Sequence, residues 1–367
     1  MRNKRFILNF LSVLLFLNGE AQTQKSGTSG SISNFADFES AMPPVRYSGN
    51  PIMKHGGWAG GQLEEPCILV NPKDRDKLIM FYSGASLVKT DGGKAAIAKA
   101  WAYQSNPLVW YEYADNPILT NDPTIPFEGE NVRLDCVLYH ADSDEYWIYY
   151  TGTAGESLSG VHAIGLATCL AGEDGYSGVT KTNIVKYKGN PILTARGEGR
   201  NDGTHVSQSA IEFDGGMYHM YYSYRGAEIL PGIRYATSAD GKRWVKQGDG
   251  DILSRGPEGA PDSRYFEWHQ VFKAFNKYVI VWEAFNGKEW AVCMASANSP
   301  EGPWTKSPKN PIFRPSGIIG TFDKTFVATP AFYLIKSKWF LFYQGASDGG
   351  NYIYNTWDIG AAELFLH

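Results

Sequence analysis

Acidic side chains precede several apolar segments of this chain, and they are the residues best suited to chemistry. Glu64-Glu65-Pro66 precedes the first segment, Arg133-Leu134-Asp135 the second, and Glu267-Trp268-His269-Gln270 the fourth. If these segments converge in the fold, the carboxylates repel each other and the pKa values of neighbouring carboxyl groups move apart. One group can then be an ionised base or nucleophile while another is a protonated acid. Such a pair flanking a glycosidic bond is what glycoside hydrolysis requires.

Polar residues at the other segments widen the set of candidates. Asp202-Gly203-Thr204-His205 and Ser207-Gln208 precede the third segment, and Phe322-Asp323-Lys324-Thr325 precedes the fifth. His205 and His269 could ligate a metal, bind sugar hydroxyl groups, or pack as ordinary loop histidines. Because two histidines from separate segments lack the tight spacing of a metal site, the sequence predicts no metal.

Cationic and aromatic side chains lie near the same positions. Arg133 and Arg225 could grip a carboxylate or sulfate group of a substrate. The alternative is that they orient an acidic side chain of the protein, which we favour for Arg133. Trp58 and Trp268 lie in predicted loops and could stack on a sugar ring, whereas the other tryptophans fall mostly in predicted strands and fit the core.

A recurring phrase, Asn-Pro-Ile or a close relative, indicates which elements position these residues. It occurs at intervals of about 60 to 75 residues, as Asn50-Pro51-Ile52, Asn116-Pro117-Ile118, Asn190-Pro191-Ile192, the degenerate Gly250-Asp251-Ile252, and Asn310-Pro311-Ile312. That interval is too long for a solenoid repeat and suits a four-stranded propeller blade with generous loops. The sequence therefore predicts an all-β fold, a five-bladed β-propeller of four-stranded antiparallel blades.

Alignment of the repeats predicts the strands of each blade. First strands are expected at 67–70, 136–139, 210–213, 271–274 and 331–334, and second strands at 78–83, 146–151, 218–223, 278–283 and 339–344. Third strands are expected at 95–98, 164–167, 233–237, 291–295 and 359–362, and fourth strands around Trp110, Trp244 and Trp304. We predict that Val45-Arg46-Tyr47 supplies the missing outer strand of the fifth blade and closes the ring, which removes an open edge. Because first strands line the axis of a propeller, the acidic residues would face a narrow funnel suited to a small ligand.

The first residues have the form of a signal peptide. A basic stretch at residues 1–5 is followed by an apolar run at 6–17, and Gly19-Glu20-Ala21 suits a cut before Gln22. The apolar run is too short to span a membrane. The sequence predicts a signal peptide at 1–21, a flexible leader at 22–43 and a single propeller domain at 44–367. We expect a periplasmic or extracellular protein without membrane insertion.

Composition narrows the possible partners. The formal net charge of -4 gives no reason to expect nucleic acid as a partner. An aromatic content of 14% and 40 glycines fit a turn-rich β protein. Equivalent positions of adjacent blades are too far apart for an S–S bond, so we expect no disulfide framework and small apolar roles for Cys67, Cys136, Cys169 and Cys293.

The pattern resembles the five-bladed propeller glycosidases, the group that contains glycoside hydrolase families 43, 32, 117 and 130. The Asn-Pro-Ile phrases carry the resemblance, together with Tyr82-Ser83-Gly84, Tyr150-Thr151-Gly152 and the segment from Ala236 to Gly241. In that group an Asp before Pro opens the first blade as base or nucleophile, and Glu65-Pro66 stands at that position here.

The resemblance also implies roles in the later blades. Asp135, with Arg133 nearby, matches the second-blade acid, and His269 resembles the fourth-blade His of family 43. The general-acid Glu of the third blade is absent, because the matching positions read Ser207-Gln208-Ser209. The remaining substitutes, with the best first, are Glu267, Asp202 and His205.

Together these observations predict an exported, exo-acting glycoside hydrolase that removes a terminal sugar from a plant or algal oligosaccharide or polysaccharide fragment without a cofactor. Two alternatives stay open, a phosphorylase like those of family 130 and a sugar-binding propeller that lacks catalysis. The predicted catalytic residues are Glu65, Asp135 and Glu267. The predicted substrate-binding residues are Glu64, Arg133, Asp202, His205, Gln208, Arg225, Trp268, His269 and Asp323.

Overall fold

The computed structural model describes residues 31–85, 94–155, 160–196, 203–226, 232–347 and 356–366. Within these ranges the chain forms antiparallel β-sheets and one short helix, α1 (Phe35–Ser40). The described strands form three four-stranded sheets and one eight-stranded sheet, and for reference we number the four-stranded units within them one to five along the chain. Units two and three are joined by a single parallel pair, His205 opposite His162. No helix in the described ranges is long and apolar enough to cross a membrane.

Each unit runs from an inner first strand to an outer fourth strand. Unit one contains β2 (Gln62–Val70), β3 (Lys77–Ala85), β4 (Ala95–Tyr103) and β5 (Asn106–Glu112). Unit two contains β6 (Asn131–His140), β7 (Glu145–Ala154), β8 (Val161–Leu170) and β9 (Val185–Lys186). Unit three contains β10 (His205–Asp214), β11 (Met217–Arg225), β12 (Ile233–Ser238) and β13 (Val245–Lys246). Unit four contains β14 (Tyr265–Ala274), β15 (Lys277–Phe285), β16 (Trp290–Ala297) and β17 (Thr305–Lys306), and unit five contains β18 (Phe326–Ile335), β19 (Lys338–Ala346), β20 (Asp358–Glu363) and β1 (Val45–Arg46).

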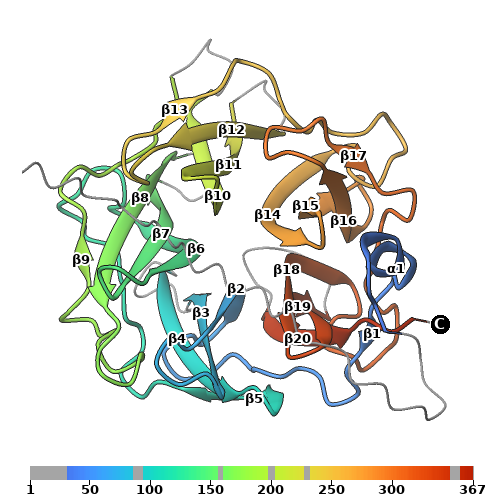
Figure 1. Ribbon diagram of the computed structural model, residues 1–367, viewed down its shortest axis with the longest axis horizontal. Helices are drawn as coiled ribbons and strands as arrows, with labels where there is room; N and C mark the ends of the chain where they lie inside the picture. Colours follow the sequence, from blue (N-terminus) through green and yellow to red (C-terminus); the bar gives the residue numbers. More distant parts are fainter. Residues whose placement is uncertain are drawn as a thin grey trace, which may run out of the picture.

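The units surround a common centre, with β2, β6, β10, β14 and β18 innermost (Figure 1). These first strands contact one another in cyclic order, from β2 through β6, β10, β14 and β18 back to β2. The predicted first, second and third strands all lie inside observed strands, but the first strands begin five or six residues earlier than predicted. These strands therefore include Glu64, Glu65, Arg133 and Asp135, which the sequence places just before them.

The Asn of the repeated phrase binds the third strand of its own unit, which explains why the phrase recurs. In unit two the Asn190 side chain accepts a hydrogen bond from the backbone N–H of Leu166 at 2.9 Å and donates one to the backbone oxygen of Leu166 at 2.9 Å. It also donates to the hydroxyl of Tyr150 at 3.0 Å. The same backbone bonds join Asn50 to Ala361, Asn116 to Lys99 and Asn310 to Met294.

Replacing one of these asparagines should weaken the fold measurably. We expect Asn190→Ala to lower the free energy of unfolding by about 1–3 kcal/mol, because the Leu166 backbone N–H loses its acceptor and the Leu166 oxygen and the Tyr150 hydroxyl each lose one donor. Urea denaturation would measure this loss. The exposed Asn106 offers a control, since its replacement by Ala should change stability by less than about 0.5 kcal/mol. Equal effects at the two positions would contradict this role for the phrase.

The N-terminal segment packs onto unit five instead of forming a flexible leader. Strand β1 pairs antiparallel with β20, so that Val45 lies opposite Glu363 and Arg46 opposite Ala362, as predicted for this segment. Helix α1 precedes β1, and its Phe38 is fully buried, with its ring 4.9 Å from that of Trp339 (Figure 1). The prediction of a flexible leader at 22–43 was therefore wrong from residue 35 onward. Burial of the aromatic and apolar side chains there stabilises the packed segment.

The predicted signal peptide, at 1–21, lies outside the described residues. All four cysteines are free. Cys169 and Cys293 are buried, whereas Cys67 and Cys136 are partly exposed.

Candidate active site

The residues that could take part in chemistry lie where the regular pairing of each first strand is interrupted. The register between first and second strands shifts at one place in each unit, and the residues at these shifts include Glu65, Asp135, Gln208, Trp268 and Thr329. A β-bulge of this kind inserts an unpaired residue and re-aims its side chain. Four of them have left-handed backbones, with φ of 61° at Glu65, 55° at Gln208, 23° at Trp268 and 41° at Thr329. Such strain in residues other than glycine gathers at functional sites.

Asp135 is a half-buried carboxylate that hydrogen bonds hold in place. One carboxylate oxygen accepts from the Thr151 hydroxyl at 2.7 Å. The other accepts from the Ser209 backbone N–H at 2.9 Å and from the Ser209 hydroxyl at 2.7 Å. Burial raises the pKa of Asp135 to about 6, although these bonds favour the ionised form. Asp135 is thus mostly ionised at neutral pH and close to its titration range.

Glu65, in β2, is more deeply buried and holds its proton more strongly. It is 5% exposed, and its Oε2 accepts a hydrogen bond from the Ser83 hydroxyl. Its Oε1 has no hydrogen-bond partner among the described residues. Burial raises the pKa of Glu65 well above its usual range, and the charges of Asp135 and Glu283 add to the rise. Burial is the main cause of both pKa shifts, and it favours the protonated form of Glu65, the more deeply buried of the two acids.

Polar residues on the second strands of units one, two and four link these units to the next. In unit one the Ser83 hydroxyl, which donates to Glu65, accepts from the backbone N–H of Leu134 at 2.7 Å. The Thr151 hydroxyl likewise accepts from the backbone N–H of Gln208 at 2.9 Å. Glu283 takes the equivalent place in unit four, where its Oε2 accepts from the backbone N–H of Thr329 at 3.3 Å.

Glu283 is a further buried acid of the site, and it was not among the candidates predicted from the sequence. It could have been found, because Glu283 is the one acid at a position where the other aligned second strands carry Ser83, Thr151, Ser223 and Gln344. Its buried position, with 1% exposure, and its effect on Glu65 place it in the same cluster.

Arg133 pairs with a carboxylate of the protein. This is the role that we favoured for it from the sequence, over binding an anionic group of a substrate. Its guanidinium forms an ion pair with Glu64, which is almost fully buried. It also lies 3.7 Å from Oε1 of Glu65, which is too long for a hydrogen bond. The guanidinium stands 5.8 Å from the ring centre of Trp268, within cation–π range. Arg133 thus joins residues from units one, two and four.

Arg225 forms the second ion pair of the site, with Glu267. The pair lies beside Tyr265, whose ring centre is 5.4 Å from the guanidinium. The guanidinium thus engages the Glu267 carboxylate directly. The pair suits polar recognition of a substrate better than general-acid catalysis.

Each nominated histidine has one ring nitrogen in contact with the protein and one buried nitrogen without a hydrogen-bond partner among the described residues. Nε2 of His269 lies 3.0 Å from the backbone oxygen of Tyr221, and it carries the hydrogen because a carbonyl oxygen only accepts. Burial lowers the pKa of His269 to about 4, so the ring is neutral. His205 contacts the Thr204 hydroxyl at 2.7 Å, and its ring lies 4.4 Å from that of His162. Among the residues that the structure describes, no cluster of His, Cys, Asp or Glu could hold a metal.

Gln208, Trp268 and Asp202 are three other residues nominated from the sequence. The side-chain oxygen of Gln208 accepts from the backbone N–H of Trp268 at 3.1 Å, which ties unit three to unit four. Trp268 lies in β14 and not in the predicted loop. Asp202 falls outside the described residues.

Asp323 supports the fold, whereas the sequence suggested that it binds substrate. Its Oδ2 accepts from Nε of Arg46 at 2.6 Å and from the hydroxyl of Tyr343 at 2.9 Å. Equivalent ion pairs join the outer strand to the entry segment in two other units, as Lys186–Glu128 and Lys306–Asp262. The prediction overlooked this pattern because Arg46 is far from Asp323 in the sequence.

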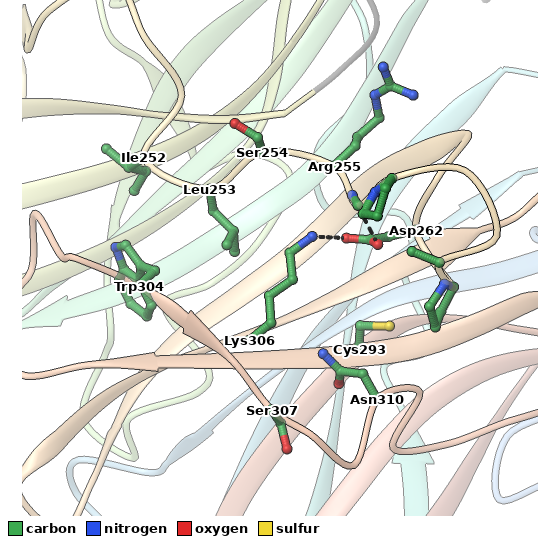
Figure 2. Close-up of a pocket in the computed structure, with 14 residues that line it drawn as sticks. Ile252, Leu253, Ser254, Arg255, Asp262, Cys293, Trp304, Lys306, Ser307 and Asn310 are labelled. Carbon is green, nitrogen blue, oxygen red and sulfur yellow. Dashed lines mark hydrogen bonds and ion pairs between the residues drawn. The ribbon is translucent and has the colours of Figure 1, made fainter.

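A cavity of about 430 Å³ lies beside the outer strand of unit four (Figure 2). Its lining includes the Lys306–Asp262 ion pair, Trp304 and Arg255, but none of the nominated site residues. A second cavity of about 320 Å³ occupies the matching place in unit five, beside Arg46. Because both lie between an outer strand and the segment that follows an Asn-Pro-Ile phrase, we attribute them to the repeat architecture.

The comparisons with known proteins support the fold. No family model and no curated protein matches the sequence. Among solved structures, the chain is similar to that of a BT0996–RGII complex, with 16% identity and a TM-score of 0.69 over 90% of this chain and 95% of that chain. It is similar to a thermostable family-43 glycoside hydrolase, with 17% identity and a TM-score of 0.59 over 87% and 93% of the two chains.

A third similar structure belongs to the GH130 family of mannoside phosphorylases, which contains glycoside hydrolases that target β-1,2 mannosidic linkages in Candida mannan. Its identity is 17% and its TM-score 0.62, over 87% of this chain and 93% of that chain. The all-β architecture of four-stranded antiparallel sheets is thus the one that these structures share. The chain has the fold of the propeller glycoside hydrolases, as the resemblance in its sequence implied.

Proposed function

We propose that this chain is an exported, five-bladed propeller glycoside hydrolase, closed by β1, that removes a terminal sugar from a plant or algal glycan. The observation that carries the proposal is the pair of buried acids, Glu65 and Asp135. They lie at equivalent bulges of adjacent first strands, and their pKa values are raised to different extents. This difference provides a proton donor and an ionised carboxylate together at neutral pH.

In the proposed reaction Glu65 acts as the general acid. Its proton passes to the glycosidic oxygen of the leaving group while the C–O bond to the sugar breaks. Asp135 supplies the negative charge, either as a base that activates water or as a nucleophile. Ser83, Thr151 and Ser209 keep the two carboxyl groups in place through their hydroxyl groups. The ion pairs Arg133–Glu64 and Arg225–Glu267 are proposed to bind the sugar hydroxyl groups.

The charges in the cluster favour hydrolysis over phosphorolysis. A phosphorylase needs cationic side chains whose charge is available to phosphate. The two arginines nominated for anion binding are each paired with a carboxylate of the protein. Their positive charge is thus already balanced, which favours water as the acceptor of the sugar.

A screen of oligosaccharides, with and without inorganic phosphate, would test the proposal. RGII fragments and β-1,2-mannosides are the first substrates to include, because similar structures are associated with them. Release of a free monosaccharide by the wild-type protein and not by Asp135→Asn supports hydrolysis. A sugar phosphate formed only with phosphate would support the phosphorylase. Binding without turnover across a broad panel would support a sugar-binding propeller.

The pH dependence of kcat/KM should follow the two acids. Asp135 must be ionised, so we expect activity to fall as the pH drops through about 6, where burial places its pKa. Glu65 must be protonated, so activity should fall again as the pH rises through its raised pKa. Because the groups interact, the two limbs report on the pair. Full activity at pH 4, near the usual pKa of a carboxyl group, would contradict this assignment.

A further inference from the structure

We propose that Glu283 and Thr329 form a strap that holds Glu65 in its catalytic position, which makes both of them positioning residues. This inference rests on the proposed function, because it assigns Glu65 as the proton donor. The strap joins three units, since Glu283 lies in β15, Thr329 in β18 and Glu65 in β2.

Two hydrogen bonds make up the strap. The Oε2 of Glu283 accepts from the backbone N–H of Thr329 at 3.3 Å. The Thr329 hydroxyl then accepts from the backbone N–H of Glu65, also at 3.3 Å. All three residues are buried, with exposures of 1%, 4% and 5% for Glu283, Thr329 and Glu65. An unpaired N–H at this depth would be costly, so each bond satisfies a donor that the bulge removes from the sheet.

The strained backbones explain why such a strap is needed. Glu65 and Thr329 have φ of 61° and 41°, in the left-handed region. This conformation is unfavourable for any residue with a side chain and most unfavourable for a β-branched one such as Thr. Strained residues keep their conformation only where the surrounding contacts over-determine it. The bonds to Thr329 and Glu283 supply those contacts, so their loss would let the Glu65 side chain leave its position.

The choice of Glu in unit four adds a charge that Ser or Thr could not provide. In units one and two a hydroxyl, from Ser83 or Thr151, accepts the equivalent bond from the next unit. The titratable groups around Glu65 are Asp135, Glu283, Glu64 and Arg133. Arg133 is engaged by Glu64, while burial, Asp135 and Glu283 raise the pKa of Glu65. Glu283 therefore both positions Glu65 and helps to keep it protonated.

Substitutions at Thr329 separate the hydroxyl from the shape of the side chain. Val has the shape of Thr but cannot accept the bond from Glu65, whereas Ser keeps the hydroxyl. We expect Thr329→Val to lower kcat about 10-fold to 100-fold with little change in KM, as small displacements of catalytic groups do. Thr329→Ser should retain most of the activity. Equal activity of wild type and Thr329→Val, with both folded by circular dichroism, would overturn the proposal.

Substitutions at Glu283 separate its charge from its hydrogen bond. Glu283→Gln keeps an acceptor for Thr329 and removes the charge, so we expect a folded protein whose basic pH limb lies at lower pH. Infrared difference spectra between each protein and its Glu65→Gln form would follow the Glu65 carboxyl group without any substrate. A lower Glu65 pKa in Glu283→Gln supports the strap, and an unchanged pKa overturns its electrostatic part.

The spectroscopic readout distinguishes failure of the strap from failure of the proposed function. If wild type hydrolyses no glycan, the proposed function fails, yet the Glu65 titration still reports on Glu283. If Glu65→Gln abolishes turnover while Thr329→Val and Glu283→Gln leave it unchanged, the function stands and the strap fails.

Discussion

Glu65→Gln is expected to lower kcat on an unactivated glycan at least about 1,000-fold, within the range found for loss of a general acid. The amide keeps the size of the side chain and can still accept from Ser83, but it carries no proton of comparable acidity. The reason lies in burial, which raises the pKa of the Glu65 carboxyl group well above its usual range and so favours the proton that general-acid catalysis needs. Initial rates with the substrate that the screen identifies would measure the loss.

Leaving-group dependence makes this prediction specific to a proton donor. An aryl glycoside with an acidic phenol needs little protonation, so Glu65→Gln should lose much less activity on it than on the natural glycan. Asp135→Asn should lose activity on both substrates, because neither reaction can dispense with the base or nucleophile. The exposed Asp142 provides a control, since Asp142→Asn should leave both rates unchanged. Near-normal turnover of the natural glycan by Glu65→Gln would remove Glu65 from the mechanism.

Arg46→Met is expected to lower the free energy of unfolding by about 1–3 kcal/mol, because the buried Asp323 carboxylate loses its cation, although the Arg46 side chain is itself 31% exposed. Asp323 is 1% exposed, and Arg46 is its cationic partner at 2.6 Å. The same guanidinium packs over the Phe313 ring, with 4.1 Å to the ring centre, and binds the backbone oxygen of Arg314. The substitution would leave a buried carboxylate without a cation and would loosen β1 from unit five. Urea denaturation followed by tryptophan fluorescence would measure the change.

Companion variants test whether the pairing with Asp323 causes this loss. Arg46→Lys keeps the positive charge and should cost less than Arg46→Met. The double variant Arg46→Met with Asp323→Asn removes the buried charge as well, so it should be more stable than the sum of the single losses predicts. Arg75 is exposed, and Arg75→Met should change stability by less than about 0.5 kcal/mol. If Arg46→Met is as mild as Arg75→Met, β1 is not held by this pair.

The sequence predicted the strands well because the repeat records local bonds. Asn116, Asn190 and Asn310 bond to the backbone of the third strand 16 to 24 residues earlier, so the phrase recurs wherever that strand pairing recurs. Asn50 makes the same bond to Ala361 across 311 residues. The glycine that ends the second strand also has a local cause. A Cβ atom at Gly84 would lie 2.6 Å from the Trp58 ring, and one at Gly152 would lie 2.6 Å from the Phe127 ring. Such requirements depend on neighbours within one unit and therefore leave a periodic trace.

Glu65 and Asp135 were also predictable, since alignment of the repeats places them in the same register. The predicted first strands began too late to include them, because the apolar pattern of each first strand is interrupted at a bulge that carries polar residues. The roles of Asp323 and Glu283 depend on contacts between segments that are distant in the sequence. Asp323 acquires a partner, Arg46, 277 residues away, and Thr329 bonds to Glu65 across 264 residues.

The sequence by itself thus determined the strands, their repeat and the positions of two acids, because local hydrogen bonding and side-chain alternation are written in neighbouring residues. Only the tertiary structure decided which acids share a cluster and which of them keeps its proton. Burial of Glu65, its approach to Asp135 and Glu283, and the pairing of Glu267 with Arg225 arise when the first strands meet around one centre. Desolvation and charge proximity depend on that three-dimensional arrangement, and no periodic pattern in the chain records them.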